Sequence, residues 1–183
     1  MIIGITGTLG SGKGTVVEYL KTKYGFKHYS ARAFISEEVA RRGMPDNRDS
    51  MHIVGNEPRT QFGPASTVDK LFERALEAGG NGVIESLRAI AEVKALQAKT
   101  PPCLVIGVDA DQKIRYERIL GRKSSTDNVS YERFIADEAR EMSDPDPNGM
   151  NIKGCLEACD VIIDNSGDLE SLYNQIDDII KPH

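Results

Sequence analysis

The order of apolar and polar residues along the chain predicts strands and helices in alternation. Short, continuous apolar runs predict strands, and apolar residues that recur every three or four positions predict helices. The expected strands cover residues 1–5, 27–30, 82–85, 103–108 and 160–164. Helices are expected around residues 16–20 and 34–40, over residues 66–78, 89–98, 112–120 and 131–142, and from an Asp168 cap to the end of the chain.

Continuous apolar strands that are each followed by a helix are typical of a parallel sheet covered by helices on both faces. The sequence therefore predicts an α/β fold with a five-stranded parallel sheet. Its 183 residues suit one domain, which we expect to span residues 1–183. The secondary structure of residues 44–64 stays undecided, because Pro45, Gly55 and Pro58 interrupt any regular hydrophobic period. Residues 143–149 predict a loop.

Composition narrows the class of protein. Hydrophobic residues make up 39% and charged residues 28%, as in soluble globular proteins. The net charge of −5, the absence of Trp and the low aromatic content argue against a nucleic-acid-binding protein. No apolar run approaches the roughly 20 residues of a membrane span, and no secretion signal is recognisable. The odd number of cysteines (Cys103, Cys155 and Cys159) suits a reducing compartment, and too few ligands accompany them for zinc. We expect a cytoplasmic protein, a monomer or a homodimer.

A glycine-rich segment separates the first strand from the first helix. It reads Gly7-Thr8-Leu9-Gly10-Ser11-Gly12-Lys13, and this spacing in this context is typical of a phosphate-binding loop. Glycine lets phosphate oxygens approach backbone N–H groups, the helix N-terminus attracts anions, and the lysine reaches the β- and γ-phosphates. Glycines that serve only a tightly packed turn are the alternative. The expected ATP-binding residues here are Gly10, Ser11, Gly12, Lys13, Gly14 and Thr15.

The residue after the lysine distinguishes this loop from the standard one. Gly14 stands where Ser or Thr is usual, and Thr15 supplies the hydroxyl one position later. Residues 10–15 thereby resemble the loop of adenylate kinases and related nucleoside monophosphate kinases, which usually have Pro in place of Leu9. Residues 3–7 also resemble dephospho-coenzyme A kinases. The resemblance implies a three-layer P-loop NTPase fold, ATP as phosphoryl donor, and Mg²⁺ held with the help of Thr15.

Two arginines follow predicted strands at positions that resemble the acceptor site of these kinases. The family has an arginine after the second strand and another after the third, and both bind the acceptor phosphate; here they are Arg32 and Arg88. Glu85 stands where the family has Asp, and the family's Gly and Pro are missing. An acid at this place can hold Mg²⁺ through water or orient the acceptor. Acceptor choice is expected in residues 31–64, where Arg59 is a candidate contact. A solvated helix face is the alternative for each arginine.

The predicted helix at residues 112–120 ends in a segment that resembles the start of the adenylate kinase lid. The resemblance implies that Arg118 lies on the adenine and that Arg122 meets the ATP phosphates, followed by a short lid over residues 121–130. Arg140 on the next helix would reach the transferring phosphate, although salt bridges with Asp137 or Glu138 are an equal alternative. Asn165 begins a turn that resembles the adenine-contacting turn of these kinases, and is also an ordinary turn sequence.

Three classes of function fit these features. The favoured one is a nucleotide kinase in which Lys13, Arg88, Arg122 and Arg140 stabilise the transferring phosphate and a nucleoside or deoxynucleoside monophosphate is the acceptor. A dephospho-coenzyme A-like acceptor would instead present a hydroxyl, and Glu85 would then accept its proton. A module that binds nucleotide without transferring phosphate would not need the arginines, and a nucleic-acid-stimulated ATPase fits the acidic net charge poorly.

Overall fold

The sheet has the predicted parallel architecture. The computed structural model describes residues 1–121, 130–143 and 149–181, apart from the side chains at positions 48, 49, 52, 56 and 59. The strands of the described part are β1 (Ile2–Gly7), β2 (Lys27–Ser30), β3 (Gly82–Glu85), β4 (Leu104–Asp109) and β5 (Val161–Asp164). They lie in the order β2-β3-β1-β4-β5, and every neighbouring pair is parallel. The predicted fold class is therefore confirmed.

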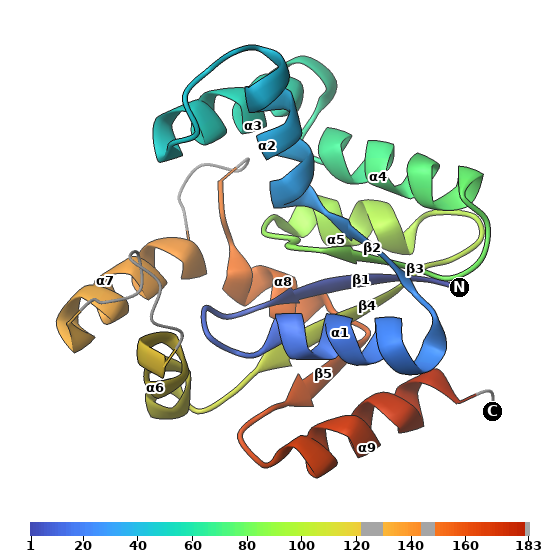
Figure 1. Cartoon of the computed structure of the whole chain (residues 1–183), viewed down its shortest axis with the longest axis vertical. Coiled ribbons are helices and arrows are strands. Elements are labelled where there is room, and N and C mark those ends of the chain that lie inside the picture. Colours follow the sequence, from blue (N-terminus) through green and yellow to red (C-terminus); the bar gives the residue numbers. More distant parts are fainter. Residues whose placement is uncertain (122–129, 144–148, 182–183) are drawn as a thin grey trace.

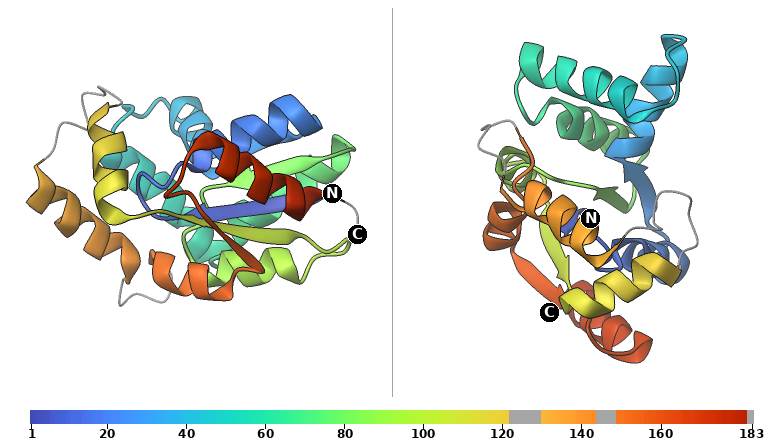
Figure 2. Two further views of the ribbon diagram at one scale, coloured as in Figure 1. Left: turned by 90° about the horizontal axis from the view of Figure 1, so that it is seen from below. Right: turned by 90° about the vertical axis from the view of Figure 1, so that its left-hand side faces the viewer.

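Helices cover both faces of this sheet (Figures 1 and 2). On one face lie α1 (Lys13–Tyr24) and α9 (Leu169–Ile180), whose apolar residues share a core with β1, β3, β4 and β5. On the other lie α4 (Ser66–Glu77), α5 (Ile90–Gln97) and α8 (Ile152–Ala158). The remaining helices are α2 (Ala31–Arg41), α3 (Arg48–Phe62), α6 (Gln112–Gly121) and α7 (Tyr131–Met142). Because both faces are buried, the central strands can be continuously apolar.

Most of residues 44–64, the segment that the sequence leaves undecided, is helical. Residues 48–62 form α3, with Pro58 inside the helix. The Asn47 side chain accepts a hydrogen bond from the Ser50 backbone N–H at 2.9 Å and so caps the start of the helix. Gly55 is buried, and a Cβ there would lie 3.2 Å from Ile35 Cδ1 of α2. The helix is thus supported by packing against α2, which the interrupted period does not reveal.

The carboxyl ends of all the strands meet at one edge of the sheet, which is the edge where ligands bind in parallel α/β folds. Gly7 pairs with Val108, so β1 and β4 both run to this edge, beyond the predicted end of β1 at Ile5. In Figure 1, α6 and α7 lie beyond this edge, and α2 leads away from it toward α3. The sheet therefore brings the glycine-rich loop, the residues after β3 and the turn after β5 to the same end of the molecule.

Two predictions from composition, one on membrane spans and one on the cysteines, can be compared with the described residues. None of their helices is long and apolar enough to cross a membrane. Cys103 and Cys155 are buried, Cys159 is partly buried, and all three are free thiols. Burial raises the pKa of the Cys155 thiol to about 12, so it stays protonated at neutral pH. These cysteines are packing residues, in agreement with the interpretation from the sequence.

Candidate active site

The glycine-rich loop connects β1 directly to the first turn of α1. Gly7, Gly10 and Gly12 have φ of +147°, +78° and +93°, a region that other residues rarely adopt. A Cβ at Gly7 would lie 2.0 Å from the Val108 carbonyl oxygen, and one at Gly10 would lie 2.6 Å from the Arg115 carbonyl oxygen. Both the backbone conformation and the close approach require glycine here. The loop therefore presents backbone N–H groups at a helix N-terminus without side chains in the way.

Lys13, the first residue of α1, folds back over this loop. Its Nζ donates hydrogen bonds to the carbonyl oxygens of Gly7 and Thr8, each at 2.8 Å. The ammonium is thereby held beside the loop. A phosphate bound there would meet both the positive end of α1 and this cation.

Asp109, at the end of β4, fixes the loop from the neighbouring strand. Its Oδ1 accepts hydrogen bonds from the Thr8 hydroxyl at 2.6 Å and from the Ala110 backbone N–H at 2.9 Å. The sequence prediction missed this residue. The signal that could have found it is its position, because an acid that directly follows an apolar strand lies at the ligand-binding edge, as Glu85 does.

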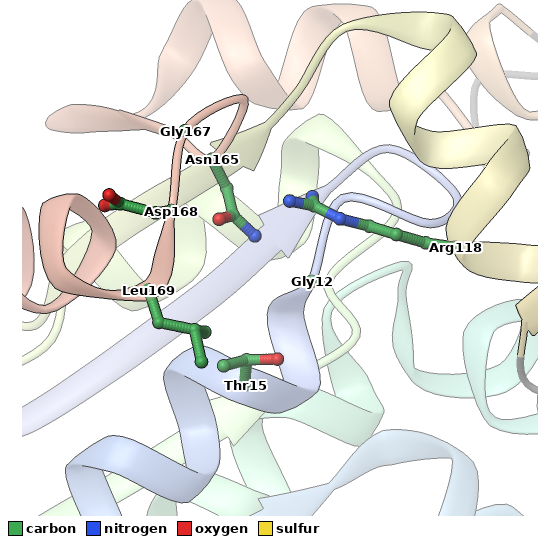
Figure 3. A pocket seen from close by; sticks show the side chains of 7 residues that line it. All are labelled: Gly12, Thr15, Arg118, Asn165, Gly167, Asp168 and Leu169. Carbon is green, nitrogen blue, oxygen red and sulfur yellow. The ribbon is translucent and has the colours of Figure 1, made fainter.

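A cavity of about 390 Å³ opens beside the loop (Figure 3). Its lining combines the start of α1, α6 and the turn before α9, and consists of Gly12, Thr15, Arg118, Asn165, Gly167, Asp168 and Leu169. In Figure 3 the Arg118 guanidinium points from α6 toward Asn165. Arg118 Nη1 is buried and has no hydrogen-bond partner in the described part of the chain. The structure thus brings together four predicted ATP-binding residues, Gly12, Thr15, Arg118 and Asn165, around one space.

Asn165 also holds the loop itself. Its Nδ2 donates a buried hydrogen bond to the Ser11 carbonyl oxygen at 2.8 Å, and its backbone N–H donates to the Asp109 carbonyl oxygen at 2.7 Å. A Cβ at Gly12 would lie 2.2 Å from the same Nδ2. The Asn165 side chain therefore links the turn after β5 to the glycine-rich loop. The turn sequence alone does not indicate this contact.

Glu85 ends β3, next to β1 in the sheet. Ile5 of β1 pairs with it, so it lies close to the loop. His28 Nε2 lies 3.1 Å from Glu85 Oε2, and this contact, aided by the positive charges of Lys13 and Arg88, holds the pKa of Glu85 below its ordinary value. Glu85 is therefore ionised at neutral pH. Ser86, which follows it, has φ of +77°, an uncommon conformation for a non-glycine residue at the end of a strand.

Arg88 lies on the same side as Glu85 but faces α7. Its Nη1 lies 3.3 Å from Glu141 Oε1 and 3.3 Å from Met150 Sδ. Its backbone N–H donates to Glu92 Oε2 at 2.7 Å, so the buried carboxylate of Glu92 holds the chain after β3. The predicted acceptor residues Glu85 and Arg88 thus sit at the same end of the sheet as the loop.

The other predicted arginines lie on exposed surfaces or outside the described residues. Arg32 is exposed on the first turn of α2. The Arg140 side chain is 74% exposed, and its Nη1 lies 4.0 Å from Asp137 on its own helix. Arg122 and most of the predicted short lid at residues 121–130 lie outside the described residues, as do the side chain of Arg59 and residues 144–148 of the predicted loop. The roles of these residues remain predictions.

The predicted Mg²⁺ ligands are compatible with how this ion is bound in kinases. The described residues contain no group of three or more His, Cys, Asp or Glu side chains that could hold a metal. Mg²⁺ needs no such cage, since it is usually held by one or two protein groups, substrate phosphates and water. Thr15 beside the loop and the ionised Glu85 supply oxygen atoms of the required kind.

Comparison with known families identifies the domain. A family model described as an AAA domain matches residues 6–135, which include the loop, β3 with its following arginine, and α6. The chain belongs to this AAA domain family. The match covers more than half of the chain.

Individual proteins are similar to this chain over nearly its full length. The UPF0200 protein of Pyrobaculum aerophilum is 26% identical over 180 residues, which are 98% of this chain and 96% of the relative. The crystal structure of shikimate kinase from Bacteroides thetaiotaomicron is similar, with a TM-score of 0.63 at 12% identity over 98% of each chain. A gluconokinase from Sinorhizobium meliloti has a TM-score of 0.56 at 17% identity, over 95% of this chain and 87% of its own. The chain thus has a P-loop kinase-like fold.

Proposed function

We propose that this chain is a cytoplasmic enzyme that transfers the γ-phosphate of ATP to a small phosphorylated acceptor of the nucleoside monophosphate class. The observation that carries the proposal is the convergence of the glycine-rich loop and Lys13 with Glu85 and Arg88 at the ends of the adjacent strands β1 and β3. Donor phosphates on the loop would face an acceptor held by an arginine, which is the arrangement that in-line phosphoryl transfer requires.

Each group has a distinct role in this proposal. The loop amides and Lys13 bind the β- and γ-phosphates, Arg118 and Asn165 border the adenine, and Thr15 helps to hold Mg²⁺, which would neutralise charge on the phosphates. Arg32 and Arg88 bind the acceptor phosphate. Arg122 and Arg140 would stabilise the charge that develops on the transferring group. Residues 1–183 form one kinase domain, with acceptor choice in residues 31–64 and a short lid at residues 121–130.

A monophosphate acceptor needs no strong base. Its attacking oxygen is already ionised at neutral pH, so it can form the new bond to the γ-phosphorus while the bond to the β–γ bridging oxygen breaks and ADP leaves. The lowered pKa of Glu85 makes it a weak base, and it is then better suited to orienting water or the acceptor than to removing a proton.

A second candidate is transfer to a hydroxyl group, as in the dephospho-coenzyme A-like reading. One observation favours it: Glu85 ends β3 beside β1, close to the loop, and is ionised, so it can accept a proton there even though its lowered pKa makes it a weak base. The hydroxyl oxygen would attack the γ-phosphorus, its proton would pass to Glu85, and ADP would leave. Among the similar solved structures, a shikimate kinase, a gluconokinase and a sugar kinase are named after compounds that carry hydroxyl groups.

A coupled assay of ADP release separates these readings. ATP, Mg²⁺ and the purified chain are tested against a panel of nucleoside and deoxynucleoside monophosphates and a panel of hydroxyl acceptors, including dephospho-coenzyme A. The monophosphate proposal expects stimulation by at least one monophosphate. Stimulation only by hydroxyl acceptors would replace it by the second candidate. Nucleotide binding without acceptor-dependent turnover would favour a module that binds ATP without transferring phosphate.

The Glu85→Gln variant distinguishes the two acceptor classes further. If the acceptor is a hydroxyl, loss of the proton acceptor should lower kcat by about 100-fold or more. If the acceptor is a monophosphate, the effect should be nearer tenfold, because only orientation is lost. Glu18→Gln, on the exposed surface of α1, is the matched control and should leave kcat unchanged.

A further inference from the structure

Arg115 of α6 is a buried arginine to which the proposed reaction assigns no role. Its side chain is only 7% exposed. Its Nε donates to the Ala110 carbonyl oxygen at 2.8 Å, and its Nη1 donates to the carbonyl oxygen of Leu9, inside the glycine-rich loop, at 3.2 Å. A buried guanidinium is costly unless its donors are satisfied, so these contacts fix where the side chain can lie.

Two carboxylates supply the counter-charge, Glu138 of α7 and, at 3.7 Å from Arg115 Nε, Asp109 Oδ1 at the end of β4. Arg115 Nη1 forms an ion pair with Glu138 Oε1, and the Glu138 side chain is only 10% exposed. The other carboxylate oxygen accepts a hydrogen bond from Gln112 Nε2, one turn earlier on α6. The guanidinium also lies 5.7 Å from the centre of the Phe134 ring. Arg115 thus joins the loop to two helices at a single buried point.

This contact controls the direction of one peptide group in the loop. In a planar trans peptide the carbonyl and the N–H point in opposite directions. Because the Leu9 carbonyl points toward Arg115, the N–H of Gly10 must point away from Arg115. Gly10 itself packs against α6, since a Cβ there would lie 2.6 Å from the Arg115 carbonyl oxygen. The side chain and the backbone of Arg115 therefore both determine the shape of this part of the loop.

The same face of α7 also contacts Arg88, which follows β3. Glu141 lies three positions after Glu138 and hence on the same face of the helix, and it contacts Arg88 at 3.3 Å. One helix is consequently tied to the loop through Arg115 and to the proposed acceptor side through Arg88. Breaking either of these two contacts should therefore change how α7 packs at the other contact.

We propose that Arg115 is a positioning residue for nucleotide binding, which orients the Leu9–Gly10 peptide of the loop and, with Glu138, holds α7 in register with it. The inference rests on the proposed function only in taking an adenine nucleotide as the ligand of the loop. Arg115 acts through the loop and touches no substrate.

The test measures the affinity of the full-length protein for ADP that carries a fluorescent N-methylanthraniloyl group, alongside KM and kcat for ATP. Arg115→Met keeps a long apolar stem but removes every donor, and we expect it to weaken ADP binding about tenfold or more. Arg115→Lys can still donate to one carbonyl and should recover part of that loss. Lys23→Gln breaks a more exposed ion pair between α1 and α9, at the far end of α1, and should bind ADP within about twofold of the wild type.

The design separates positioning from general support of the fold. Arg115→Met and Lys23→Gln should both lower the melting temperature, but only Arg115→Met should raise KM for ATP and weaken ADP binding. A folded Arg115→Met variant with wild-type ADP affinity would overturn the proposal. If that variant does not fold, Arg115→Lys and Glu138→Gln decide, and wild-type affinity in both would overturn it equally. Failure of the wild type itself to bind any adenine nucleotide would instead reject the proposed function.

Discussion

The glycine-rich loop after β1 and the α2–α3 segment after β2 both begin at the same edge of the sheet, but they are packed differently. In the loop, a Cβ at Gly7 or Gly10 would meet a backbone carbonyl within 2.6 Å. In the α2–α3 segment, Gly43 has open space around its position, and the side chains are joined by exposed ion pairs such as Arg41 with Glu38 at 2.6 Å. The loop is fixed by close backbone packing, whereas the α2–α3 segment combines side-chain packing, as between Gly55 and Ile35, with exposed ion pairs.

This difference suggests how the two sides of the reaction can change independently. Exposed ion pairs contribute little stability each, so residues of α2 and α3 can be exchanged without loss of the fold. The loop tolerates few exchanges, because its partners Asp109, Arg115 and Asn165 are themselves buried or constrained. With the proposed donor site on the loop and the proposed acceptor site in residues 31–64, this contrast would let the acceptor site vary while the donor site stays constant. The four predictions below test the contrast in order of expected effect.

Lys13→Ala should have the largest effect. It removes the cation held beside the loop, and we expect phosphoryl transfer to fall by about 1,000-fold or more, since this charge offsets that of the transferring phosphate. The variant also loses two hydrogen bonds to the loop, so its far-ultraviolet circular dichroism must be compared with the wild type. Normal turnover by a folded Lys13→Ala protein would reject the kinase assignment.

Gly10→Ala and Gly43→Ala isolate the contribution of close packing. The two glycines have similar φ, +78° and +65°, but only the first would bring its new Cβ against a backbone oxygen. Gly43→Ala should cost about 1–2 kcal/mol from its left-handed conformation alone. Gly10→Ala should cost about 2–5 kcal/mol, because overpacking adds to that strain. Urea unfolding measures both, and equal losses would show that the loop is no more constrained than the surface turn.

Glu141→Gln tests the contact between α7 and the proposed acceptor side. Glu141 and an anionic acceptor would compete for Arg88, whose side chain is 37% exposed. Removing the negative charge should therefore lower KM for the acceptor about threefold, a size typical of a partly exposed ion pair. KM for ATP is measured in the same assay and should change less. An acceptor KM that rises would mean that Glu141 orients Arg88 for binding.

Asp177→Asn should have the smallest effect, a loss of folding stability that is fully present only above about pH 4. Asp177 of α9 accepts hydrogen bonds from Lys23, Tyr24 and Tyr19 of α1, and these lower its pKa to about 2. The folded pKa is below the unfolded value near 3.8, so the contact stabilises the fold above about pH 4 and is lost as the pH falls toward 2. The difference in melting temperature between wild type and variant should shrink over that range. A difference that is constant with pH would contradict this account.

The features that the sequence predicts well are those that depend on neighbours in the chain. The apolar runs indicate the strands to within one or two residues, and the glycine spacing before Lys13 locates the loop. Helix α3 is missed because Pro58 and Gly55 break its period, whereas its packing against Ile35 supports it. Propensity and period describe single segments, and tertiary contacts override them here.

The features that the sequence does not predict depend on contacts between distant segments. The pairing of Arg115 with Glu138 joins two helices, and no spacing in the sequence signals it. Arg118, three residues later, is assigned by resemblance and does line the cavity, but the resemblance gives no reason to single out Arg115. Hydrogen bonding distinguishes the two: Arg115 donates to backbone carbonyl oxygens inside the protein, whereas Arg118 lines the cavity and its Nη1 has no hydrogen-bond partner among the described residues.

The hydrogen bond from the Asn165 side chain to the carbonyl oxygen of Ser11 joins residues 154 positions apart. The loop near the start of the chain therefore acquires its final shape only when the last strand, β5, has taken its place beside β4. Contacts of such long sequence separation form late, because a large loop of chain must be closed first. Competence to hold a nucleotide should thus appear as one of the last events in the folding of this domain, and during synthesis only after Asn165 has emerged.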